Sequence, residues 1–339
     1  MSTSPDMDRP AFAPHDRLLV FAPHPDDETL ATGCLMQRAL ASGAAVRVVF
    51  ATDGDNNPWP QRWLERRWRI GPAERARWGI RRRDEAREAL ARLGGGAIEA
   101  RFLGWPDQGL TAMLMTDDGP VGDLAAQIGS FAPTVIALPL PEDRHPDHSA
   151  LHVLLRLALR RGPDSSRLLG YAVHRGRSLP DATDAGPMAR RKLDALAAYR
   201  SQLALSRGRL LGMAQRPELL VALAAAVDPV ARAGIELRMG RRAEELLLVR
   251  AVGHAVWRWR GAVPPAGKRR CIGPGETGGV EVVREGNRIR VADTGEVDGP
   301  VEVWAKLHRR DPRLFVFDRA GWQACVRAGR GAELRQGFG

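Results

Sequence analysis

Short apolar segments alternate with helical patterns along the first 250 residues of the chain. RLLVFA at 17–22 and AAVRVVFAT at 44–52 are continuous apolar runs broken only by arginine, which predicts two buried strands. The stretch between them, ETLATGCLMQRALASG, predicts a helix that ends at Gly43. Residues 74–93 carry apolar side chains at helical spacing and are followed by three glycines, which predicts a second helix.

The same alternation continues through the middle of the chain. AIEARFL at 97–103 predicts a third strand, and TVIALPL at 134–140 predicts a fourth, whose continuous apolar character is typical of a sheet covered on both faces. A helix is expected over 149–161. Further elements are expected at 168–174 (LLGYAVH), 187–205 (helical) and 245–250 (ELLLVR). The pattern predicts an α/β fold with a Rossmann-like, doubly wound and mostly parallel sheet.

The pattern changes after about residue 255. Gly and Pro are frequent at 261–279, as they are in linkers, and the segments beyond alternate apolar and polar residues with turn signals between them. We therefore expect a small β-rich C-terminal appendage. The expected parts are a disordered N-terminal tail at 1–16, the α/β domain at 17–255, a Gly/Pro-rich linker at 256–279 and the β-rich extension at 280–339.

Composition narrows the class of protein. The chain is 44% hydrophobic and 27% charged, and no apolar run approaches the roughly 18 residues that a membrane helix needs. The first 16 residues have neither the basic start nor the apolar stretch of a secretory signal, so we expect a cytoplasmic protein without a membrane span. Three widely spaced cysteines fit neither a disulfide framework nor a zinc knuckle.

The net charge of +11 raises the question of a nucleic-acid partner. The arginines are spread over the whole length, so no nucleic-acid partner is expected. The dense group from Arg62 to Arg83 also holds acids and tryptophans, which favours a solvated arginine-biased surface over an anion site. Trp59, Trp63, Trp68 and Trp78 are expected to serve in core or interface packing, with stacking over a sugar or lipid-linked acceptor as the alternative.

Two polar clusters follow predicted strands. HPDDE at 24–28 comes directly after the first strand, and DRHPDH at 143–148 follows the fourth. In open α/β sheets, ligands bind beyond the carboxyl ends of the strands, so the two loops are expected to converge. Histidine and carboxylate ligands without cysteine suit zinc or a similar divalent ion, and three protein ligands leave a position for water. A helix N-cap is the simpler interpretation of one such cluster alone.

These residues resemble a known family. PHPDDE at 23–28 and HPDH at 145–148 are similar to the paired signatures of the PIG-L/LmbE-like zinc-dependent de-N-acetylases, which remove acetyl groups from N-acetylglucosamine-type sugars. The resemblance covers about residues 17 to 250, so the expected domain at 17–255 would be a deacetylase domain. Supporting matches are TDG at 52–54, Arg82 with Glu85, LGWPDQGL at 103–110 and KLDALAAYRSQ at 192–202.

The resemblance implies a role for each matching residue. His24, Asp27 and His148 would bind the metal, Zn²⁺ or another divalent ion such as Fe²⁺, and Asp26 would be the general base. His145 would stabilise the oxyanion, and either Asp26 or His145 would protonate the leaving amine. Asp147 would orient a histidine or cap a helix.

The resemblance also implies substrate contacts. Arg82 and Asp107 would bind the substrate, although Arg81 and Arg83 flank Arg82 and the assignment could shift by one residue. The expected partner is a small-molecule amino sugar or glycoconjugate. The sequence leaves the exact substrate and the oligomeric state open, with a homo-oligomer as one outcome.

Two other functions compete with this hypothesis. Asp53-Gly54-Asp55 at a strand end has the DxD pattern with which metal-dependent glycosyltransferases hold a metal, but that function leaves both histidine clusters unexplained. A non-catalytic protein whose β-rich tail binds a carbohydrate or a partner is the second alternative. The intact set of His24, Asp26, Asp27 and His148 argues against it.

Overall fold

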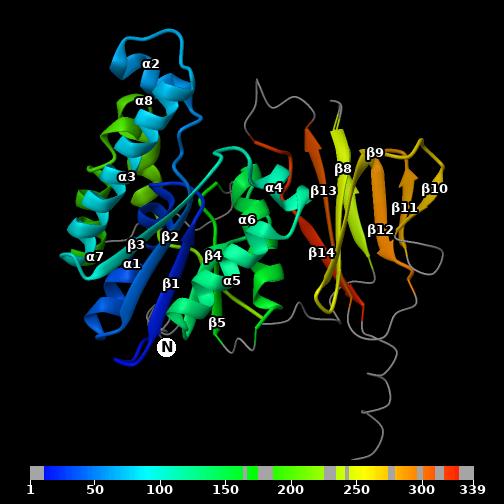
Figure 1. Cartoon of the computed structure of the whole chain (residues 1–339), viewed down its shortest axis with the longest axis horizontal. Helices are drawn as coiled ribbons and strands as arrows, with labels where there is room; N and C mark the ends of the chain where they lie inside the picture. Colours follow the sequence, from blue (N-terminus) through cyan, green and yellow to red (C-terminus); the bar gives the residue numbers. More distant parts are fainter. Residues whose placement is uncertain are drawn as a thin grey trace, which may run out of the picture. The chain divides into compact units, whose positions relative to one another are not determined.

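A computed structural model of the chain describes residues 11–162, 166–174, 186–224, 234–240, 244–273, 279–295, 301–309 and 317–327. The described residues divide into two compact units, each built from several segments of the chain (Figure 1). The first unit falls within Met1–Gln108, Gln127–Pro139 and Ser165–Leu223, and the second within Gly109–Ala126, Leu140–Asp164 and Ala224–Gly339.

A six-stranded sheet is the framework of the first unit. Its order is β3-β2-β1-β4-β5-β6, and every neighbouring pair is parallel except β5 and β6, which are antiparallel. The strands are β1 (Arg17–Ala22), β2 (Ala45–Thr52), β3 (Ile98–Trp105), β4 (Val135–Pro139), β5 (Arg167–Tyr171) and β6 (Leu220–Leu223). The prediction of a mostly parallel, Rossmann-like α/β sheet is confirmed.

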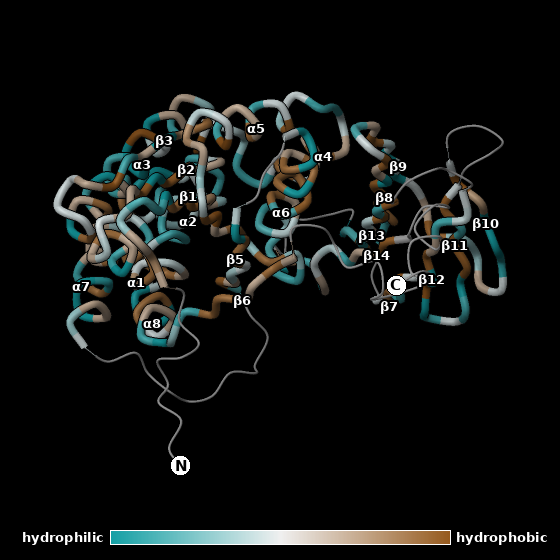
Figure 2. The backbone as a smooth tube through the Cα atoms, turned by 90° about the horizontal axis from the view of Figure 1, so that it is seen from below, coloured by the Kyte–Doolittle hydropathy of each residue, from teal (hydrophilic) through white to brown (hydrophobic). Residues whose placement is uncertain are grey.

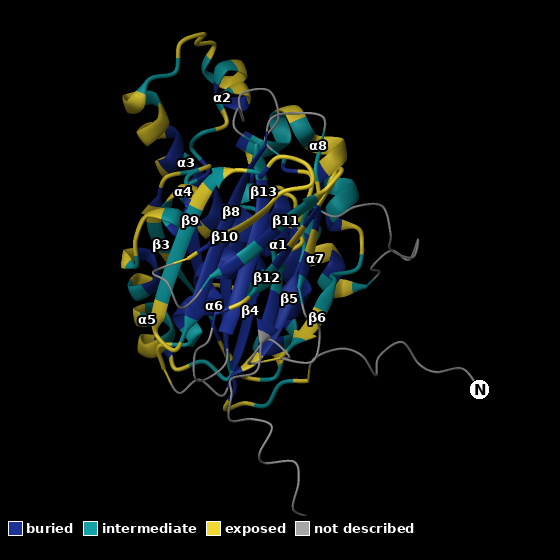
Figure 3. Ribbon diagram, turned by 90° about the vertical axis from the view of Figure 1, so that its right-hand side faces the viewer, coloured by how far each residue is buried: buried dark blue, intermediate teal, exposed yellow. Residues whose placement is uncertain are grey.

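The apolar strand sequences are buried as predicted. Every residue of β4 is buried, and β5 is buried apart from its first residue (Figure 3). The chain order of the strands reverses between β1 and β4, which lie side by side at the centre of the sheet. Ligands of open α/β sheets bind beyond the strand ends at such a reversal. Each of the two polar clusters begins just after one of these two strands.

Five helices of the first unit form a group in which α1 packs on β1 and β2 and α3 packs on β3, while α7 and α8 pack on these helices and α2 packs on α8 (Figure 1). They are α1 (Asp27–Ala41), α2 (Pro58–Glu65), α3 (Pro72–Gly94), α7 (Pro187–Leu196) and α8 (Arg200–Ala214). The helix expected over 187–205 is thus two helices. The break between them buries Ala198 and Tyr199 completely, and this placement brings the Tyr199 hydroxyl to the candidate site.

The second unit is rich in antiparallel sheet. One of its sheets has the order β10-β11-β12-β7 and the other β14-β13-β8-β9. The strands are β7 (Ile235–Arg238), β8 (Glu244–Val252), β9 (Ala255–Ala262), β10 (Arg269–Ile272), β11 (Val280–Glu285), β12 (Arg288–Asp293), β13 (Val301–Arg309) and β14 (Gln323–Arg327). Apolar and polar residues alternate along β11 and β12 (Figure 2), as expected for strands with one buried face.

Three helices lie between β3 and β5 in the chain. They are α4 (Leu110–Thr116), α5 (Gly119–Phe131) and α6 (Pro146–Leu159). Among the described helices, none combines the length and the apolar character needed to cross a membrane.

One sequence prediction about the sheet is wrong. ELLLVR at 245–250 does not extend the parallel sheet, because it lies in β8 and pairs antiparallel with β9 and β13. A continuous apolar run shows that a strand is buried but not which partner it has. Strands β9 and β10 also occupy part of the range expected as a linker. The division of the chain into a tail, a domain, a linker and an extension stays a prediction, and residues 1–10 of the tail lie outside the described residues.

A buried ion pair in the first unit joins helix α7 to Glu218, which lies between α8 and β6 and also contacts helix α1. Lys192 Nζ lies 3.0 Å from Glu218 Oε1, and the two side chains are 0% and 2% exposed. The Glu218 carboxylate also accepts the backbone N–H groups of Cys34 at 2.6 Å and Leu35 at 2.9 Å. The Lys192 stem passes over Gly33, where an added Cβ would lie 3.0 Å from Lys192 Cγ.

Removal of the Lys192 charge should destabilise this unit. We expect Lys192→Met to lower the free energy of unfolding by about 3–5 kcal/mol, because it leaves the buried Glu218 carboxylate without its cation. Urea unfolding followed by far-UV circular dichroism measures the change. Lys268→Ala, at an exposed position, is the control and should change it by less than about 0.5 kcal/mol. An unchanged unfolding midpoint in Lys192→Met would show that the pair is not important for stability.

Candidate metal centre

The loop between β1 and α1 holds the first cluster in a strained conformation. Asp26 caps helix α1 with φ of 117°, a left-handed value that costs a non-glycine residue about 1–3 kcal/mol. Its N–H donates to Glu28 Oε2 at 3.0 Å, and its carbonyl accepts the N–H of Leu30 at 2.9 Å. Local hydrogen bonds therefore maintain the strained backbone.

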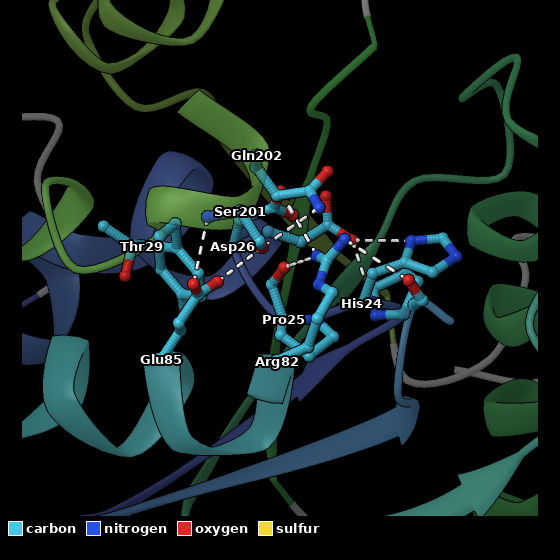
Figure 4. A network of polar contacts seen from close by, with 12 residues as sticks. His24, Pro25, Asp26, Thr29, Arg82, Glu85, Ser201 and Gln202 are labelled. Carbon is cyan, nitrogen blue, oxygen red and sulfur yellow. Dashed lines mark hydrogen bonds and ion pairs between the residues drawn. The ribbon is translucent and has the colours of Figure 1, made fainter. Parts of the chain in front are cut away.

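Arg82 of helix α3 fastens this loop from outside (Figure 4). Its side chain is 4% exposed, its Nη2 donates to the carbonyl of Pro25, and the same atom lies 3.4 Å from Asp26 Oδ2. Its Nη1 approaches the carbonyl of Gly54 at 3.4 Å. Gly54 has φ of 61°, and a Cβ there would lie 2.9 Å from Arg82 Cζ, so the close approach requires glycine.

The three adjacent arginines of helix α3 have different partners. Arg83 donates two hydrogen bonds, at 2.7 and 2.6 Å, to the two carboxylate oxygens of Asp53. Arg81 pairs with Glu85 at 3.4 Å and is 41% exposed. Arg82 is therefore the one that lies against the HPDD loop. Its expected contact with substrate stays a prediction.

A buried tyrosine supports the loop through Glu28. The Tyr199 hydroxyl donates to Glu28 Oε1, and Thr29 Oγ1 donates to the same oxygen at 2.5 Å. Burial raises the pKa of the Glu28 carboxyl. Glu28 in turn accepts the N–H of Asp26, so Tyr199 supports the Asp26 conformation from a distance in sequence of more than 170 residues. No sequence pattern predicts this role of Tyr199, and the motif match at 192–202 is its only signal.

Both ring nitrogens of His24 face carboxylates. Nδ1 lies 3.1 Å from Asp27 Oδ2, and Nε2 lies 3.1 Å from Asp107 Oδ1. A neutral imidazole carries one N–H, which can satisfy only one of the two carboxylates. A hydrogen bond from Nε2–H to Asp107 would leave the Nδ1 lone pair beside Asp27, and a nitrogen and an oxygen placed together in this way suit a shared divalent cation.

Asp107 contacts His24 of the loop after β1 and fixes its ring. Its Oδ2 accepts the backbone N–H of Asn56 at 2.7 Å, while its Oδ1 meets His24. Burial opposes ionisation of the carboxyl, but the hydrogen bond and charge of His24 outweigh it and keep the pKa of Asp107 below its ordinary value. The expected contact of Asp107 with substrate stays a prediction.

Asp26 has the opposite electrostatic character. Burial raises the pKa of its carboxyl to about 7, even though the Arg82 guanidinium nearby lowers it. A carboxyl with a pKa near neutrality can accept a proton from water and release it again at the working pH of most enzymes. Asp26 and Asp27 are neighbours in sequence, but only Asp27 contacts the His24 ring in the described hydrogen bonds.

The second cluster has its own carboxylate-histidine pair in the second unit. Asp143 Oδ2 lies 3.1 Å from His148 Nδ1, and both side chains are fully buried. Asp143 Oδ1 also accepts the N–H of His145 at 2.9 Å. A proton on Nδ1 leaves the lone pair of His148 on Nε2, which is the ring geometry of a metal-ligating histidine. This orienting contact of Asp143 was not predicted from the sequence.

His145 differs from His148 in the ring nitrogen that carries the proton. It caps helix α6, and its Nδ1 accepts the N–H of Asp147 at 3.3 Å. The proton of the neutral ring is therefore on Nε2, which makes this atom a hydrogen-bond donor. Asp147 is fully buried, and its Oδ1 accepts the N–H of Leu110 at 3.1 Å. That bond fixes the start of helix α4, and an orienting role of Asp147 toward a histidine stays a prediction.

Candidate metal-ligating side chains in the described part of the chain come from these clusters and from the ends of the neighbouring strands. They are His24, Asp27, Asp107, His145, Asp147, His148 and His174. Imidazole nitrogens with carboxylate oxygens, and no thiolate, are the donors that zinc and other borderline divalent ions accept. The donor set fits the metal that the sequence predicts.

The chain matches a protein family over the range that contains both clusters. Residues 19–159 match the family model PIG-L, described as GlcNAc-PI de-N-acetylase. This range begins in β1 and ends with α6, so it includes the HPDDE and HPDH motifs in their strand-loop-helix settings. Residues 19–159 therefore match the PIG-L family, as the motifs predict.

Curated relatives are similar over the same part of the chain. The 1D-myo-inositol 2-acetamido-2-deoxy-alpha-D-glucopyranoside deacetylase of Tsukamurella paurometabola is 31% identical over 167 residues, which are 42% of this chain and 54% of that protein. The protein of the same name from Mycolicibacterium smegmatis is 33% identical over 162 residues, 44% of this chain and 55% of that protein. The chain thus spans about half the length of the curated relatives it matches.

Solved structures give weaker similarities. The antimicrobial reagent A40926 pseudoaglycone deacetylase Dbv21 aligns with a TM-score of 0.44 at 25% identity, over 58% of this chain and 87% of that chain. The N,N'-diacetylchitobiose deacetylase from Pyrococcus horikoshii aligns with a TM-score of 0.49 at 19% identity, over 64% of this chain and 88% of that chain.

The Asp143–His148 pair leads to a test of metal affinity. We expect Asp143→Ala to weaken Zn²⁺ binding about 10- to 100-fold, because His148 loses the carboxylate that fixes its ring and tautomer. Competition with a chromophoric zinc chelator measures the dissociation constant. Glu142→Ala, at the exposed neighbouring position, is the control and should bind like the unaltered protein. Equal affinity in the two variants would exclude an orienting role for Asp143.

Proposed function

We propose that the chain is a metal-dependent amidohydrolase that removes an N-acetyl group from an N-acetylglucosamine-type amino sugar or glycoconjugate. The observation that carries this proposal is the placement of the two motifs. They follow β1 and β4, which are adjacent parallel strands, within the range that matches the PIG-L family. The curated relatives, which are named deacetylases of an acetamido sugar, support the same reaction and substrate class.

His24, Asp27 and His148 are the proposed metal ligands, with Zn²⁺ as the expected ion and Fe²⁺ as another candidate. Asp107 and Asp143 support this assignment, because each places a carboxylate 3.1 Å from a ring nitrogen of one of the histidines. A bound divalent ion would lower the pKa of a water molecule and polarise the amide carbonyl.

Asp26 is the proposed general base. Its pKa of about 7 allows the carboxylate to take a proton from the attacking water at neutral pH. Arg82 and Glu28 both hold the peptide group between Pro25 and Asp26, Arg82 at its carbonyl and Glu28 at its N–H, so the carboxylate has a fixed direction. Positioning of this kind lowers the entropic cost of the attack.

His145 is the proposed donor to the oxyanion. Its Nε2–H tautomer follows from the hydrogen bond that Nδ1 accepts, so the ring can donate while it is neutral. The leaving amine would take its proton from Asp26, which has gained one from water, or from a protonated His145. Arg82 and Asp107 are proposed to contact the sugar in addition to their contacts with the loop.

The contacts of Asp53 weigh against a DxD-type glycosyltransferase. Both of its carboxylate oxygens accept hydrogen bonds from Arg83, at 2.7 and 2.6 Å. A metal ligand in a DxD motif needs an oxygen directed at the ion. The bidentate contact instead ties the end of β2 to helix α3.

Substitution of the base should separate catalysis from metal binding. We expect Asp26→Ala to keep one equivalent of metal and to lose about 10²- to 10⁴-fold in kcat, since it removes the base and not a ligand. Asp26→Asn, which tolerates the left-handed backbone, should behave in the same way. His148→Ala is the contrasting variant and should lower the metal content, as measured by elemental analysis. Loss of metal from Asp26→Ala would mean that Asp26 and Asp27 have exchanged roles.

Removal of the metal tests the reaction class. We expect a chelator to abolish acetate release from N-acetylglucosaminides, including an inositol-linked one, and added Zn²⁺ to restore it. Enzymatic quantification of acetate with a panel of such sugars measures the rates and ranks the substrates. Full activity after complete removal of the metal would contradict the proposed chemistry. Bound metal without acetate from any sugar would contradict the proposed substrate class.

A further inference from the structure

Helix α2 and the turn after it expose three tryptophans. Trp59, Trp63 and Trp68 are 60%, 67% and 77% exposed, and Leu64, next to Trp63 in sequence, is 39% exposed. Packing in the core is therefore wrong for Trp59, Trp63 and Trp68, and their packing in an interface stays a prediction, whereas Trp78 is fully buried. Large exposed apolar side chains that lie together mark a surface that binds something. We name Trp59, Trp63, Leu64 and Trp68 the tryptophan surface.

The helix that carries this surface is fixed to the first unit. Pro60 and Gln61 are buried, and Gln61 Nε2 donates to the carbonyl of Glu74 at 2.8 Å. Arg77 pairs with Glu65 at 2.5 Å, and Arg67 pairs with Glu74 at 3.0 Å. Helix α2 also packs against helix α8. The tryptophans therefore face outward from an anchored helix.

The tryptophan surface is surrounded by positive charge. Four arginines and one glutamate lie between residues 58 and 69. The Arg62 guanidinium lies over the rings of both Trp59 and Trp68, with its carbon 4.9 and 5.3 Å from their centroids. Arg66 and Arg69 are exposed, and no ion pair joins either of them to another described residue. Two cationic side chains close to the tryptophans in sequence thus have no carboxylate partner among the described residues.

The combination of tryptophan and arginine favours an anionic lipid surface as the occupant. Tryptophan rings settle at the level of lipid headgroups, and arginine binds phosphate through its planar fork. A second copy of the chain is less suitable. Three tryptophans that bury about 150–250 Å² each contribute at most about 750 Å² together. This total is less than the roughly 800 Å² per partner of a stable protein interface.

We propose that the tryptophan surface, with Arg66 and Arg69, docks the protein on the surface of an anionic lipid bilayer. The tryptophan rings insert at the headgroup level, and the arginines pair with lipid phosphates. Such a contact is peripheral and reversible, because an eight-residue helix with a few inserted side chains lies on a membrane rather than crossing it. The inference does not depend on the proposed hydrolysis.

Sedimentation with vesicles tests the docking. The full chain is mixed with vesicles of phosphatidylcholine alone and with vesicles that contain one quarter phosphatidylglycerol, and the bound fraction gives an apparent Kd. We expect at least about tenfold tighter binding to the anionic vesicles, and weaker binding at high salt. Trp59→Ala/Trp63→Ala/Trp68→Ala and Arg66→Ala/Arg69→Ala should each weaken binding by about tenfold or more.

Matched controls separate this surface from general exposure and from catalysis. Arg101→Ala on β3 and Leu205→Ala on α8 remove an exposed arginine and an exposed leucine elsewhere in the same unit, and neither should change binding. Asp26→Ala should bind vesicles like the unaltered protein, so failure of the proposed hydrolysis would leave this test intact. Acetate release from a soluble sugar should be unchanged in the tryptophan variant.

Several results would overturn the proposal. They are absence of sedimentation with anionic vesicles, equal binding to both lipid compositions, and unchanged binding of the triple tryptophan variant. Self-association that the triple variant abolishes, without vesicle binding, would assign the surface to a second copy of the chain. If the triple variant does not fold by circular dichroism, Trp68→Ala, at the most exposed of the three positions, repeats the test and should weaken binding about three- to fivefold.

Discussion

The contact between Arg82 and the loop after β1 is the interaction on which the candidate site depends. The loop holds Asp26 in a left-handed conformation that an aspartate does not adopt without support. Arg82 supplies that support from helix α3, with its guanidinium on the carbonyl of Pro25 and 3.4 Å from the Asp26 carboxylate. It also offsets part of the cost of burying the negative charges of the HPDDE motif. The close approach of Arg82 needs a glycine at position 54. The loop at 25–26, Gly54 and Arg82 therefore depend on one another for their conformation.

Burial and pairing give the acids of the site different properties. Asp107 lies against His24, and its pKa is lowered, whereas Asp26 has no histidine contact in the described hydrogen bonds, and its pKa is raised to about 7. One carboxylate therefore stays charged and orients a ring, while the other can exchange a proton near neutral pH. The two histidines of the HPDH motif differ in a similar way, because His148 faces a carboxylate and His145 faces a backbone N–H. Residues of the same type thus acquire distinct chemistry from their neighbours.

Much of the fold was predictable from periodicity. The segments at 17–22, 44–52, 97–103 and 134–140 are strands of the parallel sheet. β3, at the edge of the sheet, is only partly buried, whereas the runs in β1 and β4 are apolar because strands buried on both faces exclude polar side chains. The same property made ELLLVR ambiguous, since a buried antiparallel strand has the same composition. Exposure of the tryptophans was not predictable either. Trp59 and Trp63 recur at helical spacing, which is as typical of a packed face as of a binding surface.

The sequence by itself determined the fold class, the match of residues 19–159 to the PIG-L family and the identity of the motif residues, because strand burial and metal chemistry each restrict residue type locally. The tertiary structure alone decided which residues support those motifs. Tyr199 reaches Glu28 only because the helix is interrupted between α7 and α8. Asp107 reaches His24 only because β1 and β3 are both parallel neighbours of β2, so that their carboxyl ends lie at the same edge of the sheet. Contacts between residues far apart in sequence depend on the path of the whole chain, and no local pattern records them.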